Sequence, residues 1–263
     1  MTPLDDAHNH LHDPRLADLQ GELATMATAI PLRHSVVNGT SEGDWDAVVT
    51  LASTQPWIIP SFGLHPWFVR ERSQDYLSLL DRLLTQHPVA AIGEIGLDRW
   101  IKDPDIEAQR ECFIAQLELA RRHNRPVTIH CLKAWGLLEE ILRDLPLLPC
   151  GFLLHSYGGP SEMIPRWVQL GAYFSISPYF GHHRKAAQLE TFRSVPIERL
   201  LIETDAPDMR PSDSDNPHPL QAPDGSAINH PANLSVSLHL AERTRGITRE
   251  QLAANFERLF LSR

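Results

Sequence analysis

The chain has 263 residues, of which 42% are hydrophobic and 22% charged, and this composition is typical of a folded globular protein. A formal net charge of −9 argues against a protein that coats nucleic acid nonspecifically, but not against an enzyme that meets phosphate through metal ions. Because the chain has no run of about 18 apolar residues and its N-terminus is acidic, we expect neither a membrane span nor a signal peptide.

The first half of the chain alternates short β-rich runs with longer segments of helical periodicity. We expect strands over residues 4–10, 35–38, 57–62 and 89–94, and helices over residues 16–30, 45–52, 76–84 and 106–123. The last of these helices has the clearest pattern, because Phe113, Ile114, Leu117 and Ala120 fall on one face.

The second half continues the same alternation. We expect strands over residues 126–130, 151–155, 172–176 and 200–205, and helices over residues 137–145, 163–170 and 186–192. Pro165 must then fall in the first turn of its helix. Two further helices are expected over residues 232–243 and 248–261, with Thr248 as N-cap and Gln251 completing a capping box.

Eight strand–helix units in series predict the α/β class and a TIM (β/α)8 barrel that forms a single domain over residues 1–263. Most of the strand segments do not alternate apolar and polar residues, as expected for a parallel sheet that is buried on both faces. Residues 207–231 form a long segment rich in Pro, Asp, Asn and Ser. Since it follows the eighth strand, we expect an active-site loop there.

Residues that bind metals gather at one end of the predicted barrel. His8 and His10 stand two residues apart on an extended segment, so their side chains point to the same side. The other strand ends carry His65, Glu94, His130, His155 and Asp205. Catalytic groups of TIM barrels lie at the C-terminal strand ends. These imidazoles and carboxylates are enough for two metal ions with open positions for water and substrate.

Each residue also has a structural interpretation. His130 and His155 could be core histidines that are satisfied by hydrogen bonds, Asp205 could cap the next segment, and His65 could be a loop residue. Glu94 lies among apolar residues, where an unpaired carboxylate is unfavourable, and a metal ion would remove that penalty.

Cysteine usage indicates a reducing compartment. Cys112, Cys131 and Cys150 are odd in number and form no CxxC pair, so we expect a cytoplasmic protein without disulfides. Cys131 should face away from His130 on the same strand, which predicts a structural role for this thiol.

Six motifs together resemble the TatD family of metal-dependent DNases, in the same order and over nearly the whole chain. They are Asp6-Ala7-His8-Asn9-His10-Leu11, Gly63-Leu64-His65-Pro66, Gly93-Glu94-Ile95-Gly96-Leu97-Asp98, Ile129-His130, His155-Ser156-Tyr157-Gly158-Gly159 and Glu203-Thr204-Asp205-Ala206-Pro207. Other amidohydrolase-like barrels tend to carry a carbamylated lysine on strand four, where this chain has glutamate.

The resemblance implies a DNase that cleaves phosphodiester bonds with two divalent ions (Mg, Mn, Zn, Ni or Fe) and a metal-activated water. DNA would be the substrate, and no obligate protein partner is implied. One ion would be held by His8, His10 and Asp205, and the other by His130 and His155. Glu94 would bridge both ions, Asp205 and Glu94 would be catalytic, and His65 would bind the substrate phosphate.

The chain departs from the family pattern in three places. His12 stands where the family usually has Asp, and Trp67 stands where it often has a second His after His-Pro. After His130 the family often has a small polar residue and then Arg, so a basic contact to phosphate is either displaced to Lys133 or lost. Asn229 resembles the Asn of the family's Asn-x-Pro turn. These departures affect the expected substrate rather than the metal site.

Two other functions fit the same barrel. One is an enzyme that cleaves an ester, amide or lactone in a small molecule, and the other is a barrel retained as a non-catalytic binding protein. The second is weakened because every expected ligand is present. The basic run over residues 181–185 is either a lip of the site or a solvated loop. Assays on nucleic acid and on small esters with added metal would separate these functions.

Overall fold

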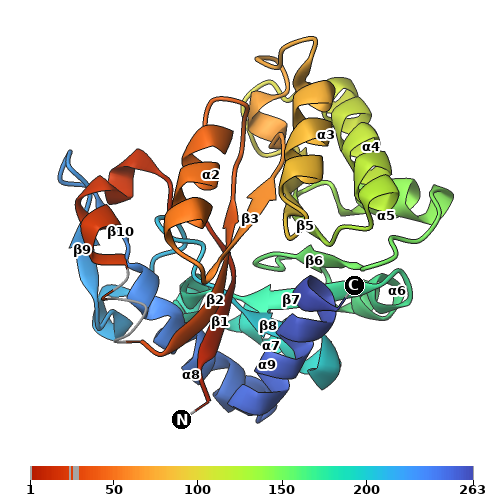
Figure 1. Ribbon diagram of the computed structural model, residues 1–263. Coiled ribbons are helices and arrows are strands. Elements are labelled where there is room, and N and C mark those ends of the chain that lie inside the picture. Colours follow the sequence, from red (N-terminus) through yellow and green to blue (C-terminus); the bar gives the residue numbers. More distant parts are fainter. Residues whose placement is uncertain (1, 24, 26–29, 263) are drawn as a thin grey trace.

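A sheet of eight parallel strands forms in the part of the chain that the structure describes, and each strand bonds to the next one in sequence (Figure 1). The computed structural model describes residues 2–23, 25 and 30–262. The strands are β1 (Leu4–Asn9), β2 (Leu32–Asn38), β3 (Ile58–Phe62), β4 (Ala91–Asp98), β5 (Val127–Leu132), β6 (Phe152–Leu154), β7 (Ala172–Ile176) and β8 (Leu200–Ile202). The predicted TIM barrel is therefore confirmed.

Helices lie around the outside of these strands (Figure 1). They are α2 (Trp45–Thr54), α3 (Tyr76–Gln86), α4 (Ile106–His123), α5 (Trp135–Asp144), α6 (Ile164–Gln169), α7 (Ala186–Thr191), α8 (Leu234–Arg245) and α9 (Arg249–Phe256). The α4 helix has the predicted bounds, and the capping box of Thr248 and Gln251 is present at the start of α9. No helix within the described residues is long and apolar enough to cross a bilayer.

Three predicted segments contain a type of secondary structure other than the one expected. Residues Pro14–Glu22 form a 3-10 helix rather than the start of an α-helix over 16–30, and the later part of that prediction lies partly outside the described residues. The carboxylate of Asp13 caps this helix by accepting from the backbone N–H of Arg15. The expected loop over residues 207–231 contains a two-stranded hairpin of β9 (Pro219–Gln221) and β10 (Ala227–Asn229). Residues Glu257–Leu261 add a π-helical turn after α9.

The β4 strand runs four residues beyond its predicted end at Glu94. Its pairing with β5 shifts register between Ile92 and Ile95, then continues to Asp98 opposite Leu132. Gly96 has a φ of +151°, and a Cβ there would lie 1.9 Å from the carbonyl oxygen of His130. This glycine therefore permits the close approach of β4 to β5 rather than ending the strand.

The β1 and β8 strands meet through individual bonds instead of a regular ladder among the described residues. The backbone N–H of Asp205 donates to His8 O at 2.9 Å, and the carboxylate of Asp6 accepts from the backbone N–H and the hydroxyl of Thr204. Because β8 ends at Ile202, Asp205 lies in the following loop rather than on the strand as predicted. Burial raises the pKa of Asp6 to about 7 despite these hydrogen bonds.

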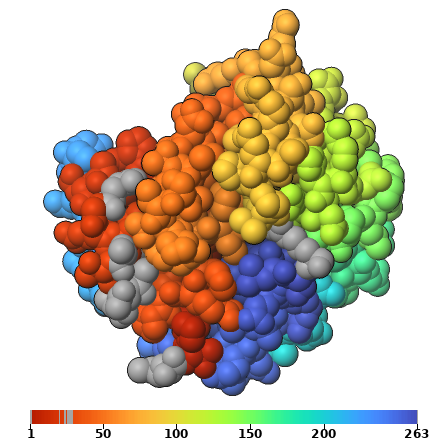
Figure 2. Space-filling view, in the orientation of Figure 1, coloured from red at the N-terminus to blue at the C-terminus, as the bar shows by residue number. Residues whose placement is uncertain are grey.

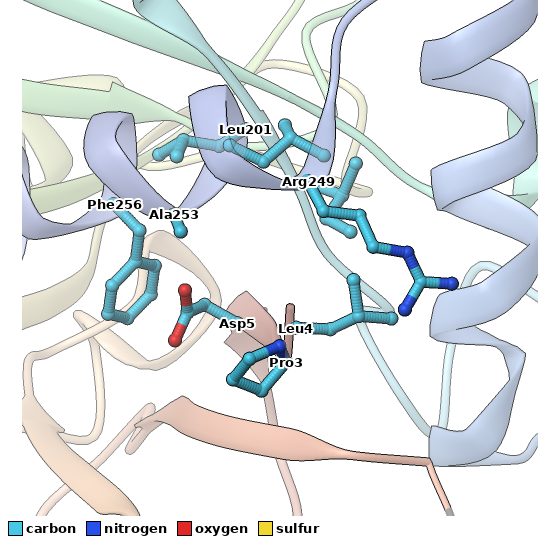
Figure 3. Close-up of a pocket in the computed structure, with 9 residues that line it drawn as sticks. Pro3, Leu4, Asp5, Leu201, Arg249, Ala253 and Phe256 are labelled. Carbon is cyan, nitrogen blue, oxygen red and sulfur yellow. The ribbon is translucent and has the colours of Figure 1, made fainter. Parts of the chain in front are cut away.

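The end of the barrel away from Asp205 is closed by α9 and the turn after it. Seven strands each contribute one buried apolar residue to a cluster with Phe256, Leu259 and Phe260. Figure 2 shows these last helical residues, in blue, beside the red start of the chain. A cavity of about 10 Å³ remains between Leu4, Leu201 and α9 (Figure 3), enough for about one water molecule. This end is packed for stability rather than for binding.

Candidate metal centre

His8 and His10 come together as their spacing predicts. Both side chains are buried, and their ring centroids lie 4.9 Å apart. His8 Nε2 lies 3.3 Å from Asp205 Oδ1, and His10 Nε2 lies 3.3 Å from Glu94 Oε2. The Nδ1 of His10 lies 2.7 Å from the carbonyl oxygen of Asn38, which can only accept. The Nδ1 of His10 is therefore the protonated nitrogen, which leaves Nε2 as a possible metal ligand.

Glu94 lies between two pairs of histidines and presents one oxygen to each pair. Its Oε2 is 3.5 Å from His8 Nε2 and 3.3 Å from His10 Nε2. Its Oε1 is 3.0 Å from His130 Nδ1 and 2.9 Å from His155 Nε2. Burial alone would raise the pKa of Glu94, but the surrounding histidines, with His155 first, hold it well below its usual value. The carboxylate is therefore ionised.

Asp205 reaches the first pair of histidines from a left-handed backbone conformation, with a φ of 53°. Its Oδ1 lies 3.3 Å from His8 Nε2 and 3.5 Å from His10 Nε2. Its Oδ2 has a more distant neighbour, His155 Nδ1 at 4.0 Å. Burial would raise the pKa of Asp205, but the neighbouring imidazoles of His10 and His8 hold it well below its usual value. The second oxygen is therefore a charged acceptor that faces the centre.

His65 differs from the other histidines of this cluster in its hydrogen bonding. Its Nδ1 accepts from the backbone N–H of Trp67 at 3.2 Å, so the neutral ring carries its proton on Nε2. That Nε2 lies 3.4 Å from Glu94 Oε1. Burial lowers the pKa of His65 to about 4, so the ring is neutral at physiological pH. His65 is therefore a hydrogen-bond donor toward the centre.

Asp98 orients His130, a role that could not be recognised from the sequence. Its Oδ2 lies 3.2 Å from His130 Nε2 and accepts from Trp67 Nε1 at 2.7 Å. Burial raises the pKa of Asp98, but these two hydrogen bonds outweigh it and lower the pKa to about 2. The arrangement presents His130 Nδ1 to the centre, like the carboxylate–histidine pairs that support metal ligands. The motif Gly93 to Asp98 was the available signal, because the same strand carries Glu94.

Glu203 has a comparable place behind His155. This buried carboxylate accepts from the backbone N–H and the hydroxyl of Ser156, and one of its oxygens lies 3.7 Å from His155 Nδ1. Glu203 lies within one of the family motifs, but its role could not be recognised from the sequence because its partners come from other strands.

The donor set fits divalent metal ions. Neither ring nitrogen of His8, nor Nδ1 of His155, has a hydrogen-bond partner although all three atoms are buried. Buried polar atoms without partners are unfavourable, and coordination of a metal ion through His8 Nε2 would remove the penalty at that atom. Three groups of ligand atoms each lie within 4.8 Å of one another: His8, His155 and Asp205; His8, His10 and Glu94; His65, Glu94 and His130. Mixed imidazole and carboxylate ligands suit Zn, Mn, Ni or Fe.

His12, which departs from the family pattern, lies beside His10. His12 Nε2 lies 3.4 Å from Asp44 Oδ2, and the His12 ring centroid is 6.0 Å from that of His10. In the basic run over residues 181–185, Arg184 and Lys185 lie over the ring of Tyr179, at 5.3 Å and 5.0 Å from its centroid. Cys131 is buried, and burial raises its thiol pKa, in keeping with a structural role.

Known proteins resemble this chain over nearly its full length. A family model described as TatD related DNase matches residues 5–261. The chain is 32% identical to the 3'-5' ssDNA/RNA exonuclease TatD of Escherichia fergusonii, covering 93% of this chain and 92% of the relative. It is 30% identical to the uncharacterized metal-dependent hydrolase YjjV of Escherichia coli K12, over 78% and 79% of the two chains. The crystal structure of YjjV, a TatD homolog, superposes with a TM-score of 0.87 at 25% identity and covers 99% of this chain and 98% of its own.

Proposed function

We propose, from the premise that this chain belongs to the family of TatD related DNases, that it cleaves phosphodiester bonds of DNA with two divalent metal ions. The chain is a metal-dependent hydrolase of the TatD type. The observation that carries the two-ion proposal is Glu94, whose two oxygens face different pairs of histidines. A single buried carboxylate divided in this way is suited to bridging two cations.

The proposed ligand sets follow these contacts. The first ion would be held by His8, His10 and Asp205, whose atoms meet around Asp205 Oδ1 and Glu94 Oε2. The second would be held by His130 and His155, whose ring nitrogens both face Glu94 Oε1.

Three side chains would complement the metal ions in the proposed reaction. Divalent ions bound at this centre would supply Lewis acidity toward the phosphoryl oxygens and lower the pKa of water. Asp205 Oδ2 is free to accept a proton from the attacking water, which is general-base catalysis. His65 Nε2–H is placed to donate to a non-bridging phosphate oxygen, because its ring is neutral and its proton faces the centre. Glu94 would hold the two halves of the site at a fixed separation.

Single-stranded DNA ends are the proposed substrate. The related protein of Escherichia fergusonii is named as a 3'-5' exonuclease of single-stranded DNA and RNA, which supports a chain end as the part that enters. Two divalent ions would bring four positive charges, whereas Glu94 and Asp205 bring two negative charges. The pocket would therefore attract an anion. We also propose a cytoplasmic location, which rests on the three cysteines, none of which forms a disulfide.

Metal content and its pH dependence test the proposal directly. We expect up to two divalent ions per chain by elemental analysis, and complete loss of nuclease activity with chelator.

Burial lowers the pKa values of His10 and His155, but nearby Asp205 and Glu94 raise both well above the ordinary value. In the metal-free protein both rings are therefore positively charged imidazolium groups at neutral pH. Metal binding must displace one proton from each ring, so metal affinity should increase as pH rises. Titration calorimetry in two buffers would measure the release, and an active enzyme without metal would refute the proposal.

The shape of the site makes a prediction about substrate. A barrel end that leads to a buried centre admits a chain end more easily than a rigid duplex. We expect linear single strands to release nucleotides faster than covalently closed circular duplex, in an assay of acid-soluble products. Equal rates on both would contradict the proposed entry of a chain end, and hydrolysis of small esters alone would favour the alternative function.

A substitution of Asp98 tests whether its contact with His130 strengthens binding of the second ion. Asp98→Asn keeps the side chain's shape but weakens the charge-assisted bond to His130 Nε2. We expect one ion to bind about 10 to 100 times more weakly, while the other is retained. Competition with a metal indicator would measure both affinities. Unchanged binding of both ions would show that Asp98 does not support the site.

A further inference from the structure

Exposed apolar side chains gather beside the proposed metal centre. Trp67 is 56% exposed, Trp100 63% and Leu132 37%, and they account for three of the six exposed large hydrophobic residues in the described part of the chain. They follow or end the neighbouring strands β3, β4 and β5. We call Trp67, Trp100, Leu132 and Lys133 the tryptophan rim. Such a cluster on an otherwise polar surface indicates a binding site.

Asp98 connects both tryptophans to the centre. Its Oδ2 accepts from the indole N–H of Trp67 at 2.7 Å, and its Oδ1 accepts from the backbone N–H of Trp100 at 2.6 Å. The same carboxylate lies 3.2 Å from His130 Nε2. The ring of Trp67 also stands at right angles to that of His65, with centroids 5.0 Å apart. Asp98 therefore fixes the side chain of Trp67 and the backbone of Trp100, and Trp67 would lose little side-chain freedom on binding.

A positive charge completes the rim. Lys133 Nζ lies 3.8 Å from the ring centroid of Trp100, and the backbone N–H of Arg99 donates to Leu132 O at 2.9 Å. That backbone bond holds the segment after β4 against the end of β5. Lys133 takes part in none of the ion pairs within 4.0 Å that the described residues form. Its charge is therefore available to a phosphate.

We propose that the tryptophan rim binds unpaired nucleobases by stacking, while Lys133 contacts a phosphate of the same strand. This proposal rests on the proposed nuclease function and adds the part of the substrate that lies outside the metal centre. Exposed aromatic rings together with a cation are what proteins use to bind single strands without reading sequence, because every base has a π-face. A closed duplex presents no free base faces to these rings. The rim would therefore favour single strands over duplex.

Two labelled oligonucleotides of equal length would test the stacking. One is oligothymidylate and the other carries abasic sites, both with hydrolysis-resistant phosphorothioate linkages, and binding to the metal-loaded protein is followed by fluorescence anisotropy. We expect the native protein to prefer oligothymidylate by about tenfold. Trp100→Ala should remove this preference by weakening binding of oligothymidylate alone. Trp67→Phe, which keeps an aromatic face, should retain most of the preference, whereas Trp67→Ala should lose it.

Trp57 provides the matched control, because it precedes β3 and lies at the other end of that strand. Trp57→Ala should leave the preference unchanged. The proposal is overturned if the native protein binds both oligonucleotides equally, or if Trp100→Ala weakens both to the same extent. If the native enzyme still digests single-stranded DNA in that case, the proposed function stands without the stacking site. If it digests no nucleic acid, the proposed function itself fails.

Discussion

Asp205→Asn is expected to lower kcat about a hundredfold or more, with little change in KM. The substitution keeps Oδ1, which faces His8 and His10, but replaces the charged Oδ2 with an amide that cannot accept a proton. Because the pKa of Asp205 is low, its proposed contribution would come from the position of the carboxylate rather than from its basicity. In the proposed reaction the proton of the water would pass to an oxygen that is already held in place, and the amide would not accept it.

The measurement pairs steady-state kinetics with elemental analysis of the purified variant. At least one ion should remain bound, because Oδ1 and both histidines are unchanged. Asp208→Asn is the matched control: this residue lies three positions later and forms an exposed pair with Arg15. It should have near-native kcat. If Asp205→Asn also had near-native kcat, Asp205 would be structural and the general base would be another residue.

Glu94→Ala is expected to weaken both ions together, by more than about a hundredfold each, and to abolish activity. This exceeds the loss typical of a residue that only supports a ligand. The reason is that each oxygen of Glu94 serves a different histidine pair. His130→Ala should instead weaken one ion and leave the other, since His130 faces a single oxygen of Glu94.

Metal titrations of both variants would separate a bridging carboxylate from an ordinary ligand. Glu118→Ala, an exposed glutamate on α4, is a control for the loss of one negative charge. Circular dichroism would establish that each variant is folded. Full occupancy of both ions in Glu94→Ala would rule out the bridge, and loss of both ions in His130→Ala would show that the two sites are not separable.

The arrangement of the barrel was predictable from the sequence because its signals are local. Apolar strand segments, the capping box at Thr248 and the strand-end histidines all depend on residues a few positions apart. The bounds of β4 were wrong because Gly93 and Gly96 favour a strand end by propensity, whereas Gly96 is needed where β4 passes close to His130. Tertiary packing outweighed the local preference.

The contacts behind the centre could not be predicted in this way. Asp98 is bonded to Trp67 and His130, which come from segments 31 and 32 residues away, and Glu203 contacts Ser156 across 47 residues. The periodicity of apolar residues gives no information about hydrogen bonds between residues so far apart in the sequence. The 3-10 helix over Pro14–Glu22 was missed for a different reason: its apolar spacing also suits an α-helix, and only the packed chain distinguishes the two.

The irregular junction between β8 and β1 has a consequence for the cohesion of the barrel. The proposed first ion would take His8 and His10 from one side of this junction and Asp205 from the other, residues that are far apart in the chain. It would therefore act as a cross-link between the first and last strands, where the ladder of backbone bonds is interrupted. Tighter binding of the ion would then make local opening of the β8–β1 junction less frequent. Amide hydrogens near Thr204 would therefore exchange faster in the metal-free protein than in the metal-bound protein.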